Sequence, residues 1–119
     1  MRYALLIYAN EQEWASQSEE QSQAQFDEYM AFTKDIVDRG IQKGGEALQV
    51  TSTATTVRVR DGQTMTTDGP FAETKEQLGG FYVVECKDLD EAIELAARIP
   101  DARSGSVEIR PVMEIDMPA

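Results

Sequence analysis

The chain has 119 residues, 22 acidic against 11 basic side chains and no histidine, and its net charge at pH 7 is -11. The missing imidazole excludes histidine-ligated zinc, histidine acid-base catalysis, histidine-activated nucleophiles and ordinary haem ligation. The acidic balance predicts that nucleic acid and anionic membranes are repelled unless a local basic patch overrides the global field. The length predicts a single domain, residues 1–119, whose core needs no disulfide or metal.

The cysteine content and the N-terminus predict a cytoplasmic protein. Cys86 is the single cysteine, so it cannot form an intramolecular disulfide. The apolar run Ala4 to Tyr8 is too short for a signal-peptide core or a membrane span. Because no histidine is present to activate Cys86, we expect a structural thiol rather than a nucleophile.

The first half of the chain begins with a strand and a helix. Residues 2–8 (RYALLIY) form a nearly continuous apolar run, which predicts a strand covered on both faces. The polar residues 11–25 predict a loop and a solvated first helical turn, with Ser18 and Gln21 as a capping box. The apolar stripe of this helix is expected to comprise Phe26, Tyr29, Met30, Thr33, Ile36 and Val37.

The helix is expected to end at Gly40 as a left-handed cap, with Ile41 contacting Ile36. Residues 46–50 then predict a second strand. Residues 56–60 alternate, Asp61-Gly62 is a strong two-residue turn signal, and residues 63–67 return as the partner strand of a hairpin. This hairpin is expected to carry two valines on one face and two arginines on the other, namely Val57 and Val59 against Arg58 and Arg60.

The second half of the chain repeats a strand, a helix and a strand. Residues 71–78 predict a loop or a single helical turn, and residues 81–86 (FYVVEC) a strand that is apolar on both faces. Asp88 and Glu91 fit the start of a helix that Pro100 ends. Its stripe is Leu89, Ala92, Ile93, Ala96 and Ile99. Residues 106–113 predict the last strand, in which Pro111 favours an edge or bulge position.

The expected order, β-α-β-β-β-β-α-β, is typical of an α+β, ferredoxin-like fold with an inserted hairpin. Two helices can cover only one face of such a sheet, yet the first strand and residues 81–84 have apolar side chains on both faces. We therefore expect the second face to pack on the same face of another copy, in a two-fold homodimer.

Residues 68–82, DGPFAETKEQLGGFY, resemble the signature of the DGPF proteins, a branch of the YCII-related family. The runs MRYALLIY, ATTVRVRDG, DLDEAIELAARIP and SVEIRPVM resemble the same branch, so the likeness covers nearly the whole chain. It implies a dimeric α/β barrel that encloses a cleft, in small, largely uncharacterised bacterial proteins that are sometimes encoded near or fused to sigma factors. The wider family has been proposed to use a histidine-aspartate pair, with the histidine near the position of Tyr29. A chain without histidine cannot use that pair.

The candidate catalytic residues are Asp68 and Tyr29. Asp68 precedes a Gly-Pro turn, where an aspartate can hold the loop by accepting backbone amides or can serve as a ligand-binding group or general base. Tyr29 can donate a hydrogen bond from its phenol or pack in the core. The two alternatives stay open for each residue.

The candidate ligand-binding residues are Tyr8, Phe71, Gly79, Gly80, Tyr82 and Arg110. The glycine pair permits close backbone approach, either to another strand or to a ligand. The aromatic side chains can line a pocket or pack in the core. Arg110, like Arg58 and Arg60, can bind an anionic group or pair with a neighbouring carboxylate. The sequence has no motif for a metal ion, a phosphate-binding loop or another cofactor, and none is expected.

Two functional hypotheses follow. The first, slightly favoured, is a dimer that binds a small organic molecule in its cleft, where Asp68 would act as acid or base if the protein is an enzyme. The second is a non-catalytic dimer that senses a ligand or acts as an accessory module in regulation. Direct DNA binding is disfavoured by the net charge.

Overall fold

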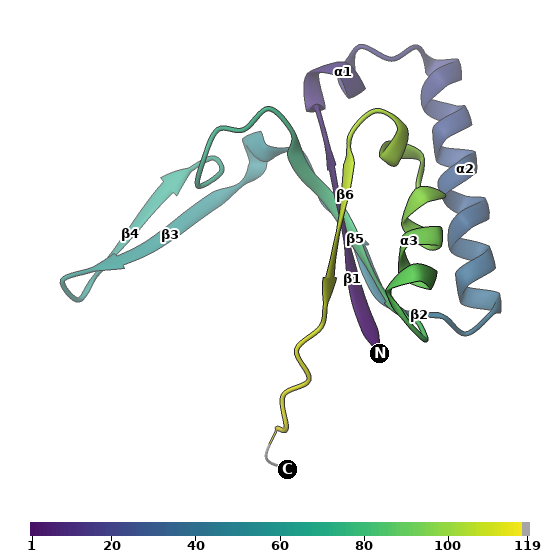
Figure 1. Cartoon of the computed structure of the whole chain (residues 1–119). Helices are drawn as coiled ribbons and strands as arrows, with labels where there is room; N and C mark the ends of the chain where they lie inside the picture. Colours follow the sequence, from purple (N-terminus) through teal and green to yellow (C-terminus); the bar gives the residue numbers. More distant parts are fainter. Residues whose placement is uncertain (118–119) are drawn as a thin grey trace.

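The computed structural model of the chain describes residues 1–117, which form an α+β fold in two layers (Figure 1). The four strands β1 (Arg2–Ala9), β2 (Gln42–Ala47), β5 (Gln77–Glu85) and β6 (Ser106–Pro111) make an antiparallel sheet in the order β2-β5-β1-β6. Helices α2 (Glu19–Asp38) and α3 (Leu89–Ala97) lie on one face of this sheet. This arrangement is compatible with the predicted ferredoxin-like pattern. The sheet of one chain is open and does not close into a barrel.

The remaining elements lie in the connections and in the inserted hairpin. Helix α1 (Glu11–Ala15) and the 3-10 turns η1 (Thr51–Thr53) and η2 (Pro100–Arg103) are short. Strands β3 (Thr55–Arg60) and β4 (Gln63–Asp68) form the hairpin. Among the described residues, no helix combines the length and the apolar character that a membrane span requires.

Both ends of α2 match the prediction from its capping residues. The Ser18 hydroxyl accepts a hydrogen bond from the Gln21 amide at 3.1 Å, and the Gln21 side chain accepts one from the Ser18 amide at 3.0 Å. At the other end Gly40 has φ +70°, and the Ile41 amide donates to the Ile36 carbonyl at 2.8 Å. The capping box and the glycine cap are therefore confirmed.

The predicted stripe of α2 is wrong in part. Phe32 and Ile36 are buried against the sheet, whereas Phe26, Met30 and Val37 are exposed. The helix contacts the sheet along a narrower line than the apolar pattern suggests, and one flank of that pattern faces solvent. In the same way α3 buries Ala92, Leu95, Ala96 and the following Ile99, but leaves Leu89 and Ile93 exposed. Helix α1 replaces part of the predicted loop; the Asn10 side chain caps it by accepting from the Gln12 and Glu13 amides.

The second strand lies four residues earlier than its prediction at residues 46–50. The Gly44-Gly45 pair is inside β2, and at Gly45 this strand approaches β5 too closely for a side chain. A Cβ atom on Gly45 would lie 2.7 Å from the Phe81 carbonyl oxygen, and Gly45 has φ +154°. Strand β5 likewise begins at Gln77 rather than at residue 81, so part of the predicted loop 71–78 is strand.

The core lies between the sheet and the two helices. Tyr3, Leu5 and Ile7 share one side of β1, as their spacing predicts, and the structure shows that this side is the buried one that faces the helices. Cys86 is buried in the same core, where burial raises the pKa of its thiol. This environment supports the structural interpretation of Cys86, since the reactive form of cysteine is the thiolate.

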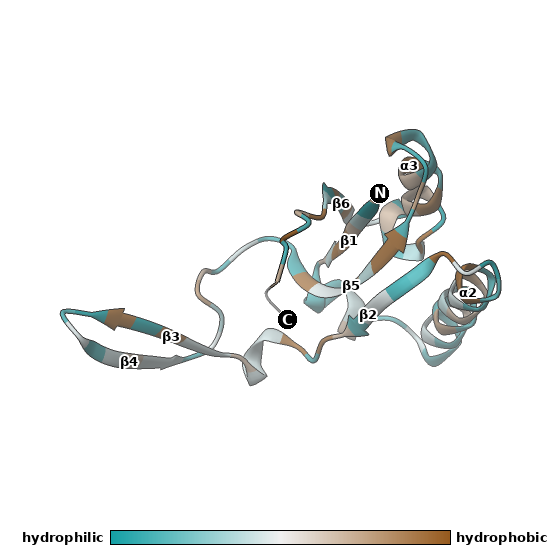
Figure 2. Cartoon of the chain, turned by 90° about the horizontal axis from the view of Figure 1, so that it is seen from below, coloured by the Kyte–Doolittle hydropathy of each residue, from teal (hydrophilic) through white to brown (hydrophobic). Residues whose placement is uncertain are grey.

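The hairpin β3–β4, residues 55–68, leaves the body of the molecule on the side away from the helices (Figures 1 and 2). We call it the hairpin arm. Asp61 and Gly62 have φ values of +51° and +76°, which confirms the predicted turn at its tip. Among the described elements, β3 and β4 make extensive contact only with each other.

Candidate functional site

Among the described elements, no helix lies on the face of the sheet away from α2 and α3 (Figure 1), and this face carries apolar side chains. In the register of the sheet, Ala4 lies opposite Val83 and Leu6 opposite Phe81, so these four side chains share one face. Each of them is half-buried by its neighbours in the sheet. We call this surface the open face, and it continues at Tyr8, which lies opposite Leu78.

A polar group borders the open face along β6. Alternation in β6 turns Val107 and Ile109 toward the core and places Glu108 and Arg110 opposite Leu6 and Ala4. The Tyr8 hydroxyl donates to Glu108 Oε1 at 3.4 Å, and Arg110 Nε donates to Glu108 Oε2 at 3.2 Å. Of the two alternatives for Arg110, pairing with a neighbouring carboxylate is thus met through its Nε.

Within this polar group, the guanidinium of Arg110 is the part that can recognise an anion. Only the Nε of Arg110 is engaged by Glu108, and within residues 1–117 its two terminal amino groups have no hydrogen-bond partner. Those amino groups can receive both oxygens of a carboxylate or phosphate. Ala4 lies opposite Arg110 in the sheet, on the apolar open face, so this face could bind a molecule that joins an anionic end to an apolar body.

Tyr29 lies on α2, on the opposite side of the sheet from this group. Its hydroxyl donates a hydrogen bond to Asp101 Oδ2, and Gln25 Nε2 donates to Asp101 Oδ1 at 3.0 Å. Asp101 is only 6% exposed. Burial, and then the hydrogen bond to Asp101, raise the pKa of Tyr29 well above its ordinary value of 10.0. The Tyr29 phenol therefore stays protonated and keeps donating to Asp101. Such a group is poorly suited to exchange protons near neutral pH.

Asp68 lies at the base of the hairpin arm and is exposed. Its carboxylate accepts no hydrogen bond from residues 1–117; the turn is closed instead by the Gly69 amide, which donates to the Ala54 carbonyl at 2.7 Å. Phe71, just beyond, is 77% exposed. Because α2 and the arm lie on opposite sides of the sheet (Figure 1), one chain does not bring Asp68 and Tyr29 together.

Of the other predicted residues, Tyr82 and Gly80 make packing contacts within this chain. Tyr82 faces the helices, shares a 2.7 Å hydrogen bond with the Thr33 hydroxyl and meets the Phe32 ring edge-on at 5.3 Å. A Cβ atom on Gly80 would lie 2.9 Å from the Glu46 carbonyl oxygen, so this glycine permits close approach to β2. Gly79 occupies the irregularity in the β1–β5 register, and a Cβ atom placed on it would meet nothing within 4 Å.

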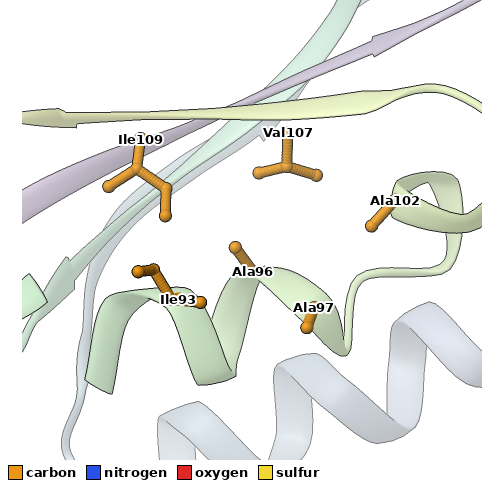
Figure 3. A pocket seen from close by; sticks show the side chains of 6 residues that line it. All are labelled: Ile93, Ala96, Ala97, Ala102, Val107 and Ile109. Atoms are coloured by element: carbon orange, nitrogen blue, oxygen red, sulfur yellow. The ribbon is translucent and has the colours of Figure 1, made fainter. Parts of the chain in front are cut away.

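Two shallow cavities lie elsewhere. One, of about 270 Å³, lies between α3 and β6 and is lined only by apolar side chains (Figure 3): Ile93, Ala96, Ala97, Ala102, Val107 and Ile109. The other, of about 280 Å³, lies beside η2, and the Glu28–Arg103 ion pair is among its lining residues. Neither contains a predicted site residue. Within residues 1–117 no three Cys, Asp or Glu side chains gather where a metal ion could bind.

Comparison with known proteins identifies the family of the chain. The model of the YCII-related domain matches residues 1–116. The chain belongs to the YCII-related family. An uncharacterized protein of Rhizobium meliloti (strain 1021) is 39% identical over 114 residues, which cover 94% of this chain and 92% of that protein.

In this YCII-related chain Tyr29, near the position where the resemblance implies a histidine, donates its hydrogen bond to Asp101. Sequence reasoning misses Asp101 because nothing near it signals burial, and its partner Gln25 falls in a segment predicted to be solvated. Glu108 is missed as well. Its alternation with Val107 and Ile109 places it on the same face as Arg110, and this pattern could have identified it.

Proposed function

We propose that this YCII-related protein is a homodimer whose two open faces enclose a cleft that binds a small organic acid. The observation that carries the proposal is the open face itself: an apolar patch bordered by Arg110, whose terminal amino groups have no partner within residues 1–117, and by the Tyr8–Glu108 contact. A second copy would shield the patch from water, which favours association through the hydrophobic effect.

Binding without turnover is the form of this function that the geometry favours. The predicted acid-base pair is split between two sides of one sheet, and the Tyr29 phenol is already bonded to Asp101. Acid-base catalysis would have to use Glu108 or Tyr8 on the open face. We therefore place the non-catalytic ligand-sensing role ahead of catalysis.

The dimer is tested first by light scattering on the wild-type chain. We expect a mass of two chains at micromolar concentration. A stable monomer under these conditions would contradict the proposal.

Ligand binding is tested by nuclear magnetic resonance, with benzoate as an anionic aromatic probe and benzyl alcohol as its neutral counterpart. We expect benzoate to shift the amide signals of Leu6, Phe81 and Arg110 in a saturable way. Replacing Arg110 by Gln should weaken benzoate binding about tenfold. The matched control is Arg60→Gln, which removes an arginine of the hairpin arm. Equal affinities for the two probes, or equal losses in the two variants, would overturn the anion site.

A further inference from the structure

No other helix or strand of the described chain packs extensively on the hairpin arm. A two-stranded hairpin alone is at best marginally stable in water, because it has no hydrophobic face covered. Here Val57 and Val59 are 59% and 58% exposed, and their cross-strand partners are threonines, Thr66 and Thr64. We call this side of the arm the valine face. Some other surface must cover it if the arm is to be stable.

The size of the molecule shows how much surface is uncovered. A compact domain of this length has a radius of gyration of about 13.5 Å, whereas the Cα radius of gyration here is 16.5 Å. A compact monomer of 13.3 kDa exposes about 6,450 Å², whereas this chain exposes 8644 Å². The excess, about 2,200 Å² per chain, is comparable to what each subunit buries in an obligate homodimer.

The direction of the arm favours a second copy as its partner. The arm leaves the body on the same side as the open face, away from both helices (Figures 1 and 2). A copy that docks its open face on this one therefore lies beside the arm. Two-fold symmetry then places the partner's arm beside this body in the same way.

Charge is consistent with the same partner. The arm carries Arg58 and Arg60 against Asp61 and Asp68, so it is neutral, and the net charge of -11 belongs to the rest of the chain. Two such bodies repel each other, but a neutral arm with an uncharged valine face can approach an acidic body. Arg58 and Arg60 lie on the opposite side of the arm and, within residues 1–117, form no ion pair that would hold the arm to its own body.

We propose that the hairpin arm clasps a second copy of the chain, packing its valine face on the partner's body beside the open face. This inference rests on the dimer of the proposed function. Three hydrogen bonds within the chain hold the base of the arm. Gly69 is bonded to Ala54, the Thr56 hydroxyl donates to the Gly69 carbonyl at 2.8 Å, and Arg58 donates to the Phe71 carbonyl at 3.4 Å. These contacts orient the base of the arm relative to the exposed Phe71.

The decisive variants add the same charge to the two sides of the arm. Val57→Glu with Val59→Glu alters the valine face. Gln63→Glu with Met65→Glu, the matched control, alters the opposite side, where each new carboxylate lies across from an arginine. Sedimentation should show a dimer dissociation constant raised at least about 100-fold by the first pair and within about threefold of wild type for the second.

A deletion supplies the second measurement. Because Ala54 and Gly69 are hydrogen-bonded at the arm's base, an Asn-Gly turn can replace residues 55–68 without disturbing the sheet. We expect this variant to keep the wild-type helical circular dichroism and to be a monomer at concentrations where the wild type is a dimer. A dimer of unchanged affinity in the deletion and in the valine-face variant would overturn the clasp and leave the proposed dimer standing. A monomeric wild type would overturn both.

Discussion

At the scale of single residues, the clearest assignment is the contact between Tyr29 and Asp101. The phenol and the Gln25 amide are the two side-chain donors to a carboxylate that is almost fully buried and has no cationic partner among the described residues. A buried polar group costs free energy unless it is hydrogen-bonded. Tyr29 therefore holds α2 to the η2 turn, and its structural role is explained without a reaction.

Replacing Tyr29 by Phe should lower the free energy of unfolding by about 1–3 kcal/mol, because one oxygen of the buried Asp101 carboxylate loses its donor. Urea denaturation measures this change. Tyr8→Phe is the control, since its hydroxyl makes only a long contact with the half-buried Glu108. A Tyr29 variant as stable as wild type would show that the contact contributes nothing to stability.

The same contact predicts a pH dependence at the alkaline end. The pKa of Tyr29 is raised in the folded state, so the folded state binds the phenol proton more tightly than the unfolded chain does. The resulting stability is complete below pH 10, the ordinary tyrosine value, and is lost as the pH rises through the folded-state pKa. Wild type should therefore lose stability above pH 10 more steeply than Tyr29→Phe. Parallel pH profiles in urea denaturation would refute this.

At the scale of elements, the glycines decide how β2 and β5 pair. Gly45 and Gly80 allow the two strands to lie closer than side chains would permit, and this explains why β2 begins before its predicted position. Of the two alternatives for the glycine pair, approach to another strand is the one that Gly80 fulfils. Gly79 is different, since nothing lies within 4 Å of the Cβ it lacks.

Alanine at the two neighbouring glycines should therefore have unequal effects. Gly80→Ala places a methyl group 2.9 Å from the Glu46 carbonyl oxygen and 3.3 Å from the Ala47 Cα, and should destabilise the fold by about 1–3 kcal/mol. Gly79→Ala should stay within about 0.5 kcal/mol of wild type. Thermal and urea unfolding of both variants test the ranking. Equal losses would mean that the strands separate easily to admit the methyl group.

At the scale of the whole molecule, no other described helix or strand of the same chain covers the open face or the hairpin arm. Helices cover the sheet on one side only. Among the described elements, the two strands of the arm make extensive contact only with each other. If a second copy covers both, folding and association are linked, because the interface stabilises the folded state by mass action.

The midpoint of thermal unfolding should accordingly rise by a few degrees when the protein concentration is raised about 100-fold. Differential scanning calorimetry over this range provides the measurement. The arm-deleted variant is the control, and its midpoint should be independent of concentration. A wild-type midpoint that does not move would argue against coupling between folding and association.

The sequence by itself determined the features that depend on neighbouring residues. The Ser18 capping box, the Gly40 cap and the Asp61-Gly62 turn each need only a few adjacent residues, and alternation alone predicted that Tyr3, Leu5 and Ile7 share one side of β1. The absence of histidine likewise excludes a histidine-aspartate pair on composition alone. Such local signals persist because they are set by backbone geometry and short-range hydrogen bonds.

Tertiary structure decided everything that depends on which surfaces meet. Asp101 and Gln25 are 76 residues apart in the sequence. Only the packing of η2 on α2 buries the Asp101 carboxylate and places the Gln25 amide as its hydrogen-bond donor. Only the folded arrangement shows that Tyr29 and Asp68 lie on opposite sides of the sheet, and that Glu108 joins Tyr8 and Arg110. The physical reason is that burial and charge pairing are properties of two surfaces in contact, and a linear pattern describes only one surface at a time.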